Sequence, residues 1–103
     1  MSHKIVFSSR ALRQFKKLSK ADQIILGEEI DSLADTPFPN CVEKITAVDH
    51  CYRIRHGDYR IVYQVRNSEL VVLLLAIGDR KDIYKDLVKN LKQLINAYEL
   101  YGE

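Results

Sequence analysis

The chain has 103 residues and a formal net charge of +2; 47% of its residues are hydrophobic and 29% are charged. This length and composition predict a single soluble domain over residues 1–103 with a modest core of its own. The longest apolar run, Leu70 to Ile77, is too short to span a membrane. Because the N-terminus also lacks the features of a secretory signal, we expect a cytoplasmic protein with no membrane partner.

Charged residues are distributed unevenly along the chain. Residues 1–20 contain no acidic side chain but several basic ones: Lys4, Arg10, Arg13, Lys16, Lys17 and Lys20. The charged residues within 22–49 are all acidic except Lys44. The chain could therefore form a local basic surface that binds an anionic partner, even though its net charge is small. Cys41 and Cys51 lack the spacing of a metal site, and we expect two reduced thiols, with a disulfide as the alternative.

The first half of the chain predicts a strand followed by two helices. Residues 4–7 form the strand, and Ser8 or Ser9 can cap a helix with Leu12, Phe15 and Leu18 on one side. Ser19 followed by Asp22 resembles a second N-cap. The buried positions expected in this second helix are Ala21, Ile25, Ile30, Leu33 and Ala34. The prolines at 37 and 39 end it, because a residue before proline leaves the helical region, and residues 40–49 predict a loop.

The second half predicts three strands, at about 50–56, 59–66 and 69–77, and then a long helix at about 82–101. The run LVVLLLAI does not alternate, so the third of these strands should be buried on both faces and central in the sheet. The helix has a single apolar stripe, formed by Tyr84, Leu87, Val88, Leu91, Leu94, Ile95, Tyr98 and Tyr101. The order β-α-α-β-β-β-α indicates an α+β fold: a four-stranded, mainly antiparallel sheet with two N-terminal helices and a long C-terminal helix.

The stretch YRIRHGDYRIVY, residues 52–63, predicts a hairpin in which Gly57-Asp58 forms a type II′ turn. The expected pairs are His56 with Tyr59, Arg55 with Arg60, Ile54 with Ile61, and Arg53 with Val62. Strand alternation then gives an apolar side, formed by Tyr52, Ile54, Ile61, Tyr63 and Val65, and an opposite side with Arg53, Arg55, Arg60, Val62 and Gln64. Arginines directly opposite each other are destabilising, so this face requires an explanation.

Across the next turn, Arg60 is expected to pair with Leu75, and Arg80 to emerge near the same end of the sheet. One interpretation is a phosphate-binding surface, because the planar forked donors of arginine match phosphate oxygens. The alternative is a solvated face whose arginines pair with Asp58, Asp79 or Asp82.

The runs DHCYRIRHGDYRIVYQV and LVVLLLAIGDRKDIY resemble the RelE-type toxins of bacterial and archaeal toxin–antitoxin pairs. FSSRALRQFKKL fits the opening strand and helix of the same family, so the resemblance covers residues 4 to about 85. It implies a type II toxin that acts as a ribosome-dependent endoribonuclease (an mRNA interferase). Such a toxin cuts messenger RNA in the ribosomal A site and inhibits translation. The nucleotide's own 2′-hydroxyl attacks the adjacent phosphate, with no metal and no cofactor.

The resemblance also implies roles for individual residues. Arg53 and Arg55 fall where the family places two basic residues, often lysine, and Arg60 and Arg80 fall on its phosphate-stabilising arginines. Tyr84 falls on its C-terminal tyrosine, which could stack on a base, help to transfer a proton, or simply pack. All five residues are candidate catalytic residues, and the four arginines are also candidate RNA phosphate ligands.

A general base is not evident among these residues, because arginine effectively cannot lose a proton. Water or ribosomal RNA could accept the proton instead. His56 is an alternative base, since the unperturbed pKa of histidine is about 6.5, but alternation places it on the apolar side of the hairpin. His50 and His3 are weaker candidates.

Two other functions stay open. ParE-type relatives, which share this fold, inhibit DNA gyrase by binding it, and a third reading is an RNA- or ribosome-binding inhibitor that does not cleave. The resemblance further implies a RelB-like antitoxin, usually acidic, that is encoded nearby and forms a hetero-oligomer with the toxin. The C-terminal helix could pack on the sheet or the N-terminal helices, or it could move aside for that antitoxin or dock with it.

Overall fold

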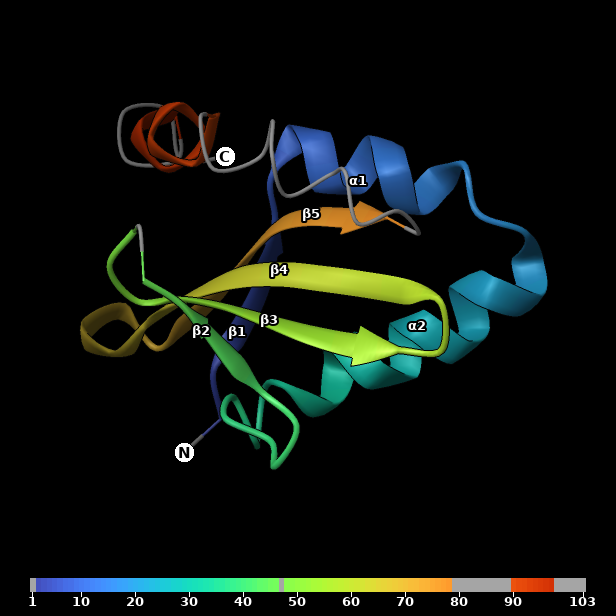
Figure 1. Cartoon of the computed structure of the whole chain (residues 1–103), viewed down its shortest axis with the longest axis horizontal. Helices are drawn as coiled ribbons and strands as arrows, with labels where there is room; N and C mark the ends of the chain where they lie inside the picture. The colour runs from blue at the N-terminus through green and yellow to red at the C-terminus, as the bar shows by residue number, and fades with distance from the viewer. Residues whose placement is uncertain (1, 47, 79–89, 98–103) are drawn as a thin grey trace.

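The structure, a computed structural model, describes residues 2–46, 48–78 and 90–97. Its centre is a five-stranded sheet with the order β1-β5-β4-β3-β2 (Figure 1). The strands are β1 (Lys4–Phe7), β2 (Glu43–Ile45), β3 (Cys51–His56), β4 (Tyr59–Arg66) and β5 (Val71–Gly78). β1 is parallel to β5, and every other neighbouring pair is antiparallel. The α+β class and the mainly antiparallel sheet are therefore confirmed.

The prediction of four strands is wrong by one. Residues 40–49 were expected to form a loop, but β2 lies within them and pairs with the outer edge of β3. Three residues are too few to show an alternating pattern, and the strand forms because β3 offers unpaired backbone groups at the sheet edge. This short edge strand brings Glu43 opposite Arg53.

Two helices cover one face of the sheet. α1 (Ser9–Lys16) and α2 (Lys20–Ser32) begin at the predicted caps, where the Ser8 and Ser19 hydroxyls accept backbone N–H bonds. Side chains of both helices pack against the apolar side of the hairpin in one core, formed by Ala11, Leu26, Ile30, Leu33, Ile54, Ile61, Tyr63, Val65, Val72, Leu74 and Ile77.

The buried face of α2 differs from the prediction at two positions. Ile25 is 47% exposed and Ala21 is exposed, while the neighbouring Leu26 is buried. Leu26, Ile30 and Leu33 recur at intervals of four and three residues and so form one stripe. Because each residue turns the helix by about 100°, Ile25 lies beside that stripe, not on it.

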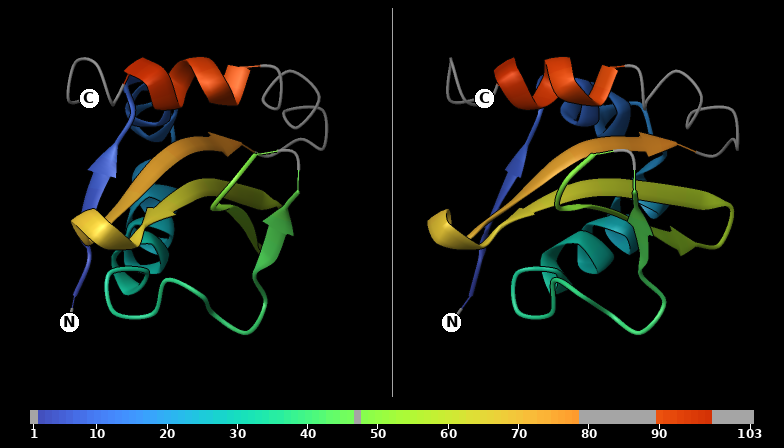
Figure 2. Two further views of the ribbon diagram at one scale, coloured as in Figure 1. Left: turned by 90° about the vertical axis from the view of Figure 1, so that its left-hand side faces the viewer. Right: turned by 60° about the vertical axis from the view of Figure 1, so that its left-hand side comes forward.

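The opposite face of the sheet carries a second core. Residues 90–97 are helical, and Leu91 and Ile95 pack there with β-strand residues that include Cys51, Val62 and Leu75. Figure 2 shows this helix (red) and α2 (teal) on opposite sides of the sheet. The expectation that β5 is buried on both faces is confirmed, but the central strand of the sheet is β4, and β5 lies between β4 and β1. Helix packing on the sheet is confirmed for the described part of the C-terminal helix. The rest of that predicted helix lies outside the described residues.

Both cysteines are free thiols, as expected, with Cys41 exposed and Cys51 buried. Burial raises the pKa of the Cys51 thiol to about 12, with a smaller contribution from the negative charge of Asp49. Cys51 is therefore a neutral core residue at physiological pH.

The predicted pairing of Arg60 with Leu75 is wrong, because Arg60 lies opposite Gly78. Two local features shift the register. A 3₁₀ turn at Asn67–Glu69, followed by Leu70 at φ 53°, makes the connection longer than a two-residue loop. A β-bulge next to Val62 and Tyr63 then leaves Leu75 as an extra residue in β5. Arg60 consequently faces the last residue of β5.

The helix at residues 90–97 should contribute substantially to stability. We expect Leu91→Ala to lower the free energy of unfolding by about 2–5 kcal/mol, because Leu91 has no exposed surface and its truncation leaves a cavity. Urea unfolding of the isolated protein measures this change. Lys92→Ala, at the adjacent exposed position, is the matched control and should stay within about 0.5 kcal/mol of the parent. Equal effects of the two substitutions would show that the helix does not pack as described.

Candidate functional site

The candidate site is built on the β3–β4 hairpin, whose turn has the predicted form. Gly57 has φ 61°, and Asp58 is not among the positive-φ residues, which is the type II′ pattern. A Cβ at Gly57 would meet no atom within 4 Å, so backbone conformation, not space, requires glycine here. All four predicted hairpin pairs are confirmed, including Arg55 opposite Arg60.

Arg53, Arg55 and Arg60 lie on the same face of the sheet, and we call these three residues the arginine face. They share this side with Val62, which is buried in the second core. The arginines lie closer to the turn than Val62 does, and there Arg55 is exposed and the other two are partly exposed. The helix of residues 90–97 thus covers the buried part of this side, while the hairpin end presents its guanidinium groups.

Glu43 is the acidic residue that the structure adds to the arginine face. Its Oε2 accepts hydrogen bonds from Nη2 of Arg53 at 2.7 Å and from Nε at 3.2 Å. These bonds, together with the positive charge of Arg53 and a smaller effect of Arg60, hold the pKa of Glu43 below its ordinary value of 4.5. Glu43 is consequently a carboxylate at neutral pH.

The alternative reading of the sequence expected the arginines to pair with Asp58, Asp79 or Asp82. In the described part of the chain, Glu43 binds Arg53, while Nε of Arg55 donates to the Gly57 carbonyl at 3.1 Å. Asp79 and Asp82 lie outside the described residues. Sequence reasoning missed Glu43 because its strand was predicted as a loop, and no pattern within three residues could have placed it beside Arg53.

Two predicted catalytic residues, Arg80 and Tyr84, lie outside the described residues. Gly78, which is opposite Arg60, precedes Arg80 by two positions in the sequence. Near this end of β5, the Gln14 side chain of α1 accepts a hydrogen bond from the Ile77 N–H at 2.8 Å. β1 pairs with β5 only as far as Leu74, so the N–H of Ile77 has no partner on β1 and bonds to Gln14 instead. The bond holds α1 beside the end of β5.

His56 lies on the other side of the hairpin, as strand alternation predicted. Its Nδ1 is 3.5 Å from Oε2 of Glu29 on α2, and the neighbouring Tyr59 hydroxyl donates to Asp22 at 2.8 Å. A hollow of about 310 Å³ separates the turn from α2 at this point, lined by Asp22, Ile25, Leu26, His56, Gly57, Asp58 and Tyr59. His56 therefore faces α2 and does not lie beside the arginine face.

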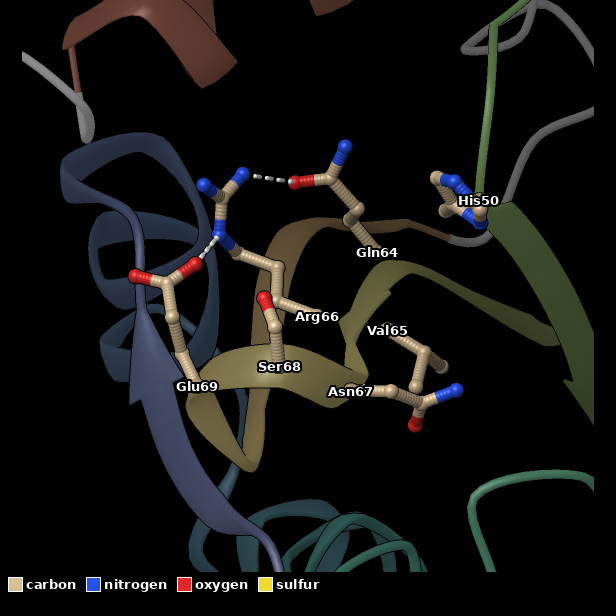
Figure 3. A pocket seen from close by; sticks show the side chains of 7 residues that line it. All are labelled: His50, Gln64, Val65, Arg66, Asn67, Ser68 and Glu69. Atoms are coloured by element: carbon tan, nitrogen blue, oxygen red, sulfur yellow. Dashed lines mark hydrogen bonds and ion pairs between the residues drawn. The ribbon is translucent and has the colours of Figure 1, made fainter.

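The other two histidines are at the far end of the sheet from the turn. His50 lines a cavity of about 460 Å³ with residues of β4 and the following turn (Figure 3). The guanidinium of Arg66 is held there between Glu69 and Gln64, with 2.9 Å to the Gln64 oxygen. His3 Nε2 is 3.0 Å from Oδ1 of Asn67. Neither histidine is near the arginine face.

Two further properties concern the described part of the chain only. Within residues 2–46, 48–78 and 90–97, no three side chains of His, Cys, Asp or Glu lie together as metal ligands could. Among the helices in those same ranges, none has both the length and the apolar character that a membrane span requires.

The chain is similar to known proteins over most of its length. A family model described as "ParE toxin of type II toxin-antitoxin system, parDE" matches residues 5–84. A RelE-like toxin protein of Escherichia coli is 32% identical over 89 residues, which cover 82% of this chain and 92% of that protein. The mRNA interferase toxin RelE of Escherichia coli K12 is 28% identical over 95 residues, covering 88% and 99% of the two chains.

Solved structures show the same similarity in the fold. A mutant of E. coli toxin RelE in the free state matches with a TM-score of 0.73 at 26% identity, covering 88% of this chain and 99% of that one. A chain of the intact E. coli RelBE toxin–antitoxin complex matches with a TM-score of 0.69 at 26% identity, covering 78% and 99%.

The ion pair of Glu43 can be tested by titration. We expect the side-chain carboxyl of Glu43 to titrate below 4.5, and its pKa to rise when Arg53→Met removes both hydrogen bonds and the charge. A carboxyl whose pKa is lowered in the folded state stabilises the fold above pH 4.5, and this contribution disappears as the pH falls through the lowered value. Carbon-13 NMR of the glutamate carboxyls measures the pKa. Arg66→Met, which breaks the pair with Glu69, is the control and should leave Glu43 unchanged.

Proposed function

We propose a function for this chain on the premise that it belongs to the RelE/ParE family of type II toxin–antitoxin toxins. The chain is the toxin component of such a pair. In our proposal it is a ribosome-dependent endoribonuclease that cuts messenger RNA in the ribosomal A site and so inhibits translation in the cytoplasm. The name mRNA interferase, which the E. coli RelE relative carries, supports this class of activity.

The observation that carries the proposal is the arginine face itself. Arg55 and Arg60 are paired directly across the ladder, and Arg53 is two residues away on β3. Like charges placed opposite each other destabilise a hairpin, so this arrangement opposes folding. An RNA phosphate offsets the repulsion by accepting charge-assisted hydrogen bonds from several guanidinium groups. A site for a scissile phosphate therefore gives this placement of like charges a function.

The chemistry proposed at this site is attack by the 2′-hydroxyl of the nucleotide on the adjacent phosphate. The pentavalent phosphorus species gains negative charge, and prepositioned guanidinium groups stabilise this charge more than they stabilise the starting phosphate. Arg60 supplies this stabilisation, with Arg53 and Arg55 binding and orienting the phosphate. Arg80 and Tyr84 keep the roles that the family resemblance implies: phosphate stabilisation, and base stacking or proton transfer. The products are a cyclic phosphate and a free 5′-hydroxyl.

We also propose a hetero-oligomer with an antitoxin. A structural relative of this chain is found in the intact E. coli RelBE complex. The partner expected here is a RelB-like protein of acidic character that is encoded in an adjacent gene and covers the arginine face. The apolar side chains of Leu91 and Ile95 lie on the sheet surface that such a partner could use if the C-terminal helix moved aside.

Inhibition of DNA gyrase is the second candidate, because the matching family model is that of ParE toxins. It predicts trapped gyrase–DNA complexes and intact messenger RNA. A third candidate, an RNA-binding inhibitor, predicts translation arrest without scission. The same purified protein can be assayed for all three outcomes.

The decisive experiment uses purified protein and ribosomes programmed with a defined messenger. We expect primer extension to show new 5′ ends within the decoding codon, and Arg60→Ala to lower the cleavage rate by about 10²–10³-fold, the usual effect of removing one transition-state donor. Arg66→Ala, on the same strand but at the other end of the sheet, is the matched control and should cleave as the parent does.

Two outcomes would contradict the proposal. Intact messenger in the presence of folded wild-type protein would exclude the endoribonuclease function. Equal cleavage by the Arg60→Ala variant and the wild type would remove Arg60 from the site. Thermal unfolding of each variant verifies that a loss of cleavage is not a loss of fold.

A further inference from the structure

Among the described residues that the sequence singled out, none beside the arginine face can accept a proton. Arginine is protonated at all relevant pH values and cannot accept the 2′-hydroxyl proton. His56 lies across the sheet, where it contacts Glu29 of α2. A base supplied by the protein itself must be on the arginine face, ionised at neutral pH, and within reach of an RNA strand.

Glu43 meets the requirement of position. It is paired with Arg53 in the β2–β3 ladder, so it lies on the same side of the sheet as Arg55 and Arg60. The next residue on that side of β2 is Ile45, which is buried in the second core and anchors the short strand. The backbone register, not a flexible loop, thus places the carboxylate beside the guanidinium groups.

The hydrogen bonding of Glu43 leaves one carboxylate oxygen available for a proton. Both bonds from Arg53 go to Oε2, so they fix the carboxylate without occupying Oε1. The side chain is 65% exposed, which allows an RNA strand to reach it. Glu43 therefore combines a carboxylate that Arg53 holds in place with an oxygen that can accept a proton.

We propose that Glu43 is the general base of the reaction, an inference that rests on the endoribonuclease function proposed above. The 2′-hydroxyl gives its proton to Glu43 while its oxygen forms a bond to the adjacent phosphorus. The bond between phosphorus and the 5′-oxygen then breaks, and this oxygen takes a proton from water. Glu43 returns its proton to the solvent, and the products are a 2′,3′-cyclic phosphate and a 5′-hydroxyl.

The charged groups around Glu43 favour its ionised form. Arg53 on β3 and Arg60 on β4 both lower its pKa, so it stays a carboxylate across the neutral range. A lower pKa also means that the carboxylate has a smaller affinity for the proton, so the same charges make it a weaker base. The opposing possibility is that Glu43 only screens the arginines from RNA. Removing the carboxylate would then accelerate cleavage.

The test compares Glu43→Gln with Glu69→Gln, a control that breaks another exposed glutamate–arginine pair at the far end of the sheet. Single-turnover cleavage on saturating programmed ribosomes should fall at least about 100-fold in Glu43→Gln, within the usual range for a general base. Ribosome binding should change less than about twofold. Glu69→Gln should match the parent in both measurements.

The pH dependence separates a base from a residue that only positions Arg53. Between pH 6 and 8 the wild-type rate should be flat, because Glu43 is ionised throughout. The residual rate of Glu43→Gln should rise about tenfold per pH unit, because hydroxide must then take the proton. A slow variant with a flat profile, or a variant as fast as the wild type or faster, would overturn the assignment while leaving the endoribonuclease function intact. Absence of cleavage by the wild type would contradict both the endoribonuclease function and the assignment of Glu43 as its base.

Discussion

The register of the β3–β4 hairpin is the constraint on which the rest of this structure depends. Gly57, at positive φ, allows a two-residue turn, and that turn fixes which residues of the two strands are opposite each other. A slip by one residue would move every side chain of a strand to the other face. A slip of β3 would take Ile54 out of the core and bring Arg53 into it, and a slip of β4 would do the same with Ile61 and Arg60. The apolar core and the arginine face are therefore two consequences of one turn.

The same register creates an electrostatic problem that the edge strand reduces. Arg55 and Arg60 face each other, and the hairpin alone brings no acidic side chain to their side of the ladder. β2 adds Glu43 from a segment that the sequence presented as a loop. An exposed pair of this kind contributes little to stability in water. Its larger consequence is to fix the orientation of a carboxylate and a guanidinium at the place where RNA would bind.

The parts of the fold that were predictable are those with a local chemical cause. Serine caps, the Gly57 turn and the hairpin pairs each follow from two to four neighbouring residues, and the structure confirms them. The pairing of Arg60 was not predictable, because a 3₁₀ turn and a bulge together decide it and neither has a clear signature. Glu43 was missed for a related reason, since only the free edge of β3 makes its segment a strand. Tertiary pairing, which a single sequence does not display, decides both cases.

The two faces of the hairpin have different surroundings. On the α2 side, Tyr59 donates to Asp22 and His56 lies near Glu29, so the tip of the hairpin is fixed to a helix whose apolar stripe is buried. On the opposite side, Leu91 and Ile95 of the helix at residues 90–97 pack in a core that includes Val62. The arginine face lies between this core and the turn of the hairpin. Catalysis by prepositioned charge requires donors that do not reorganise when charge develops. For the proposed reaction, a hairpin held on one side by polar contacts and flanked by an edge strand meets this requirement, because backbone pairing sets the positions of its charged groups.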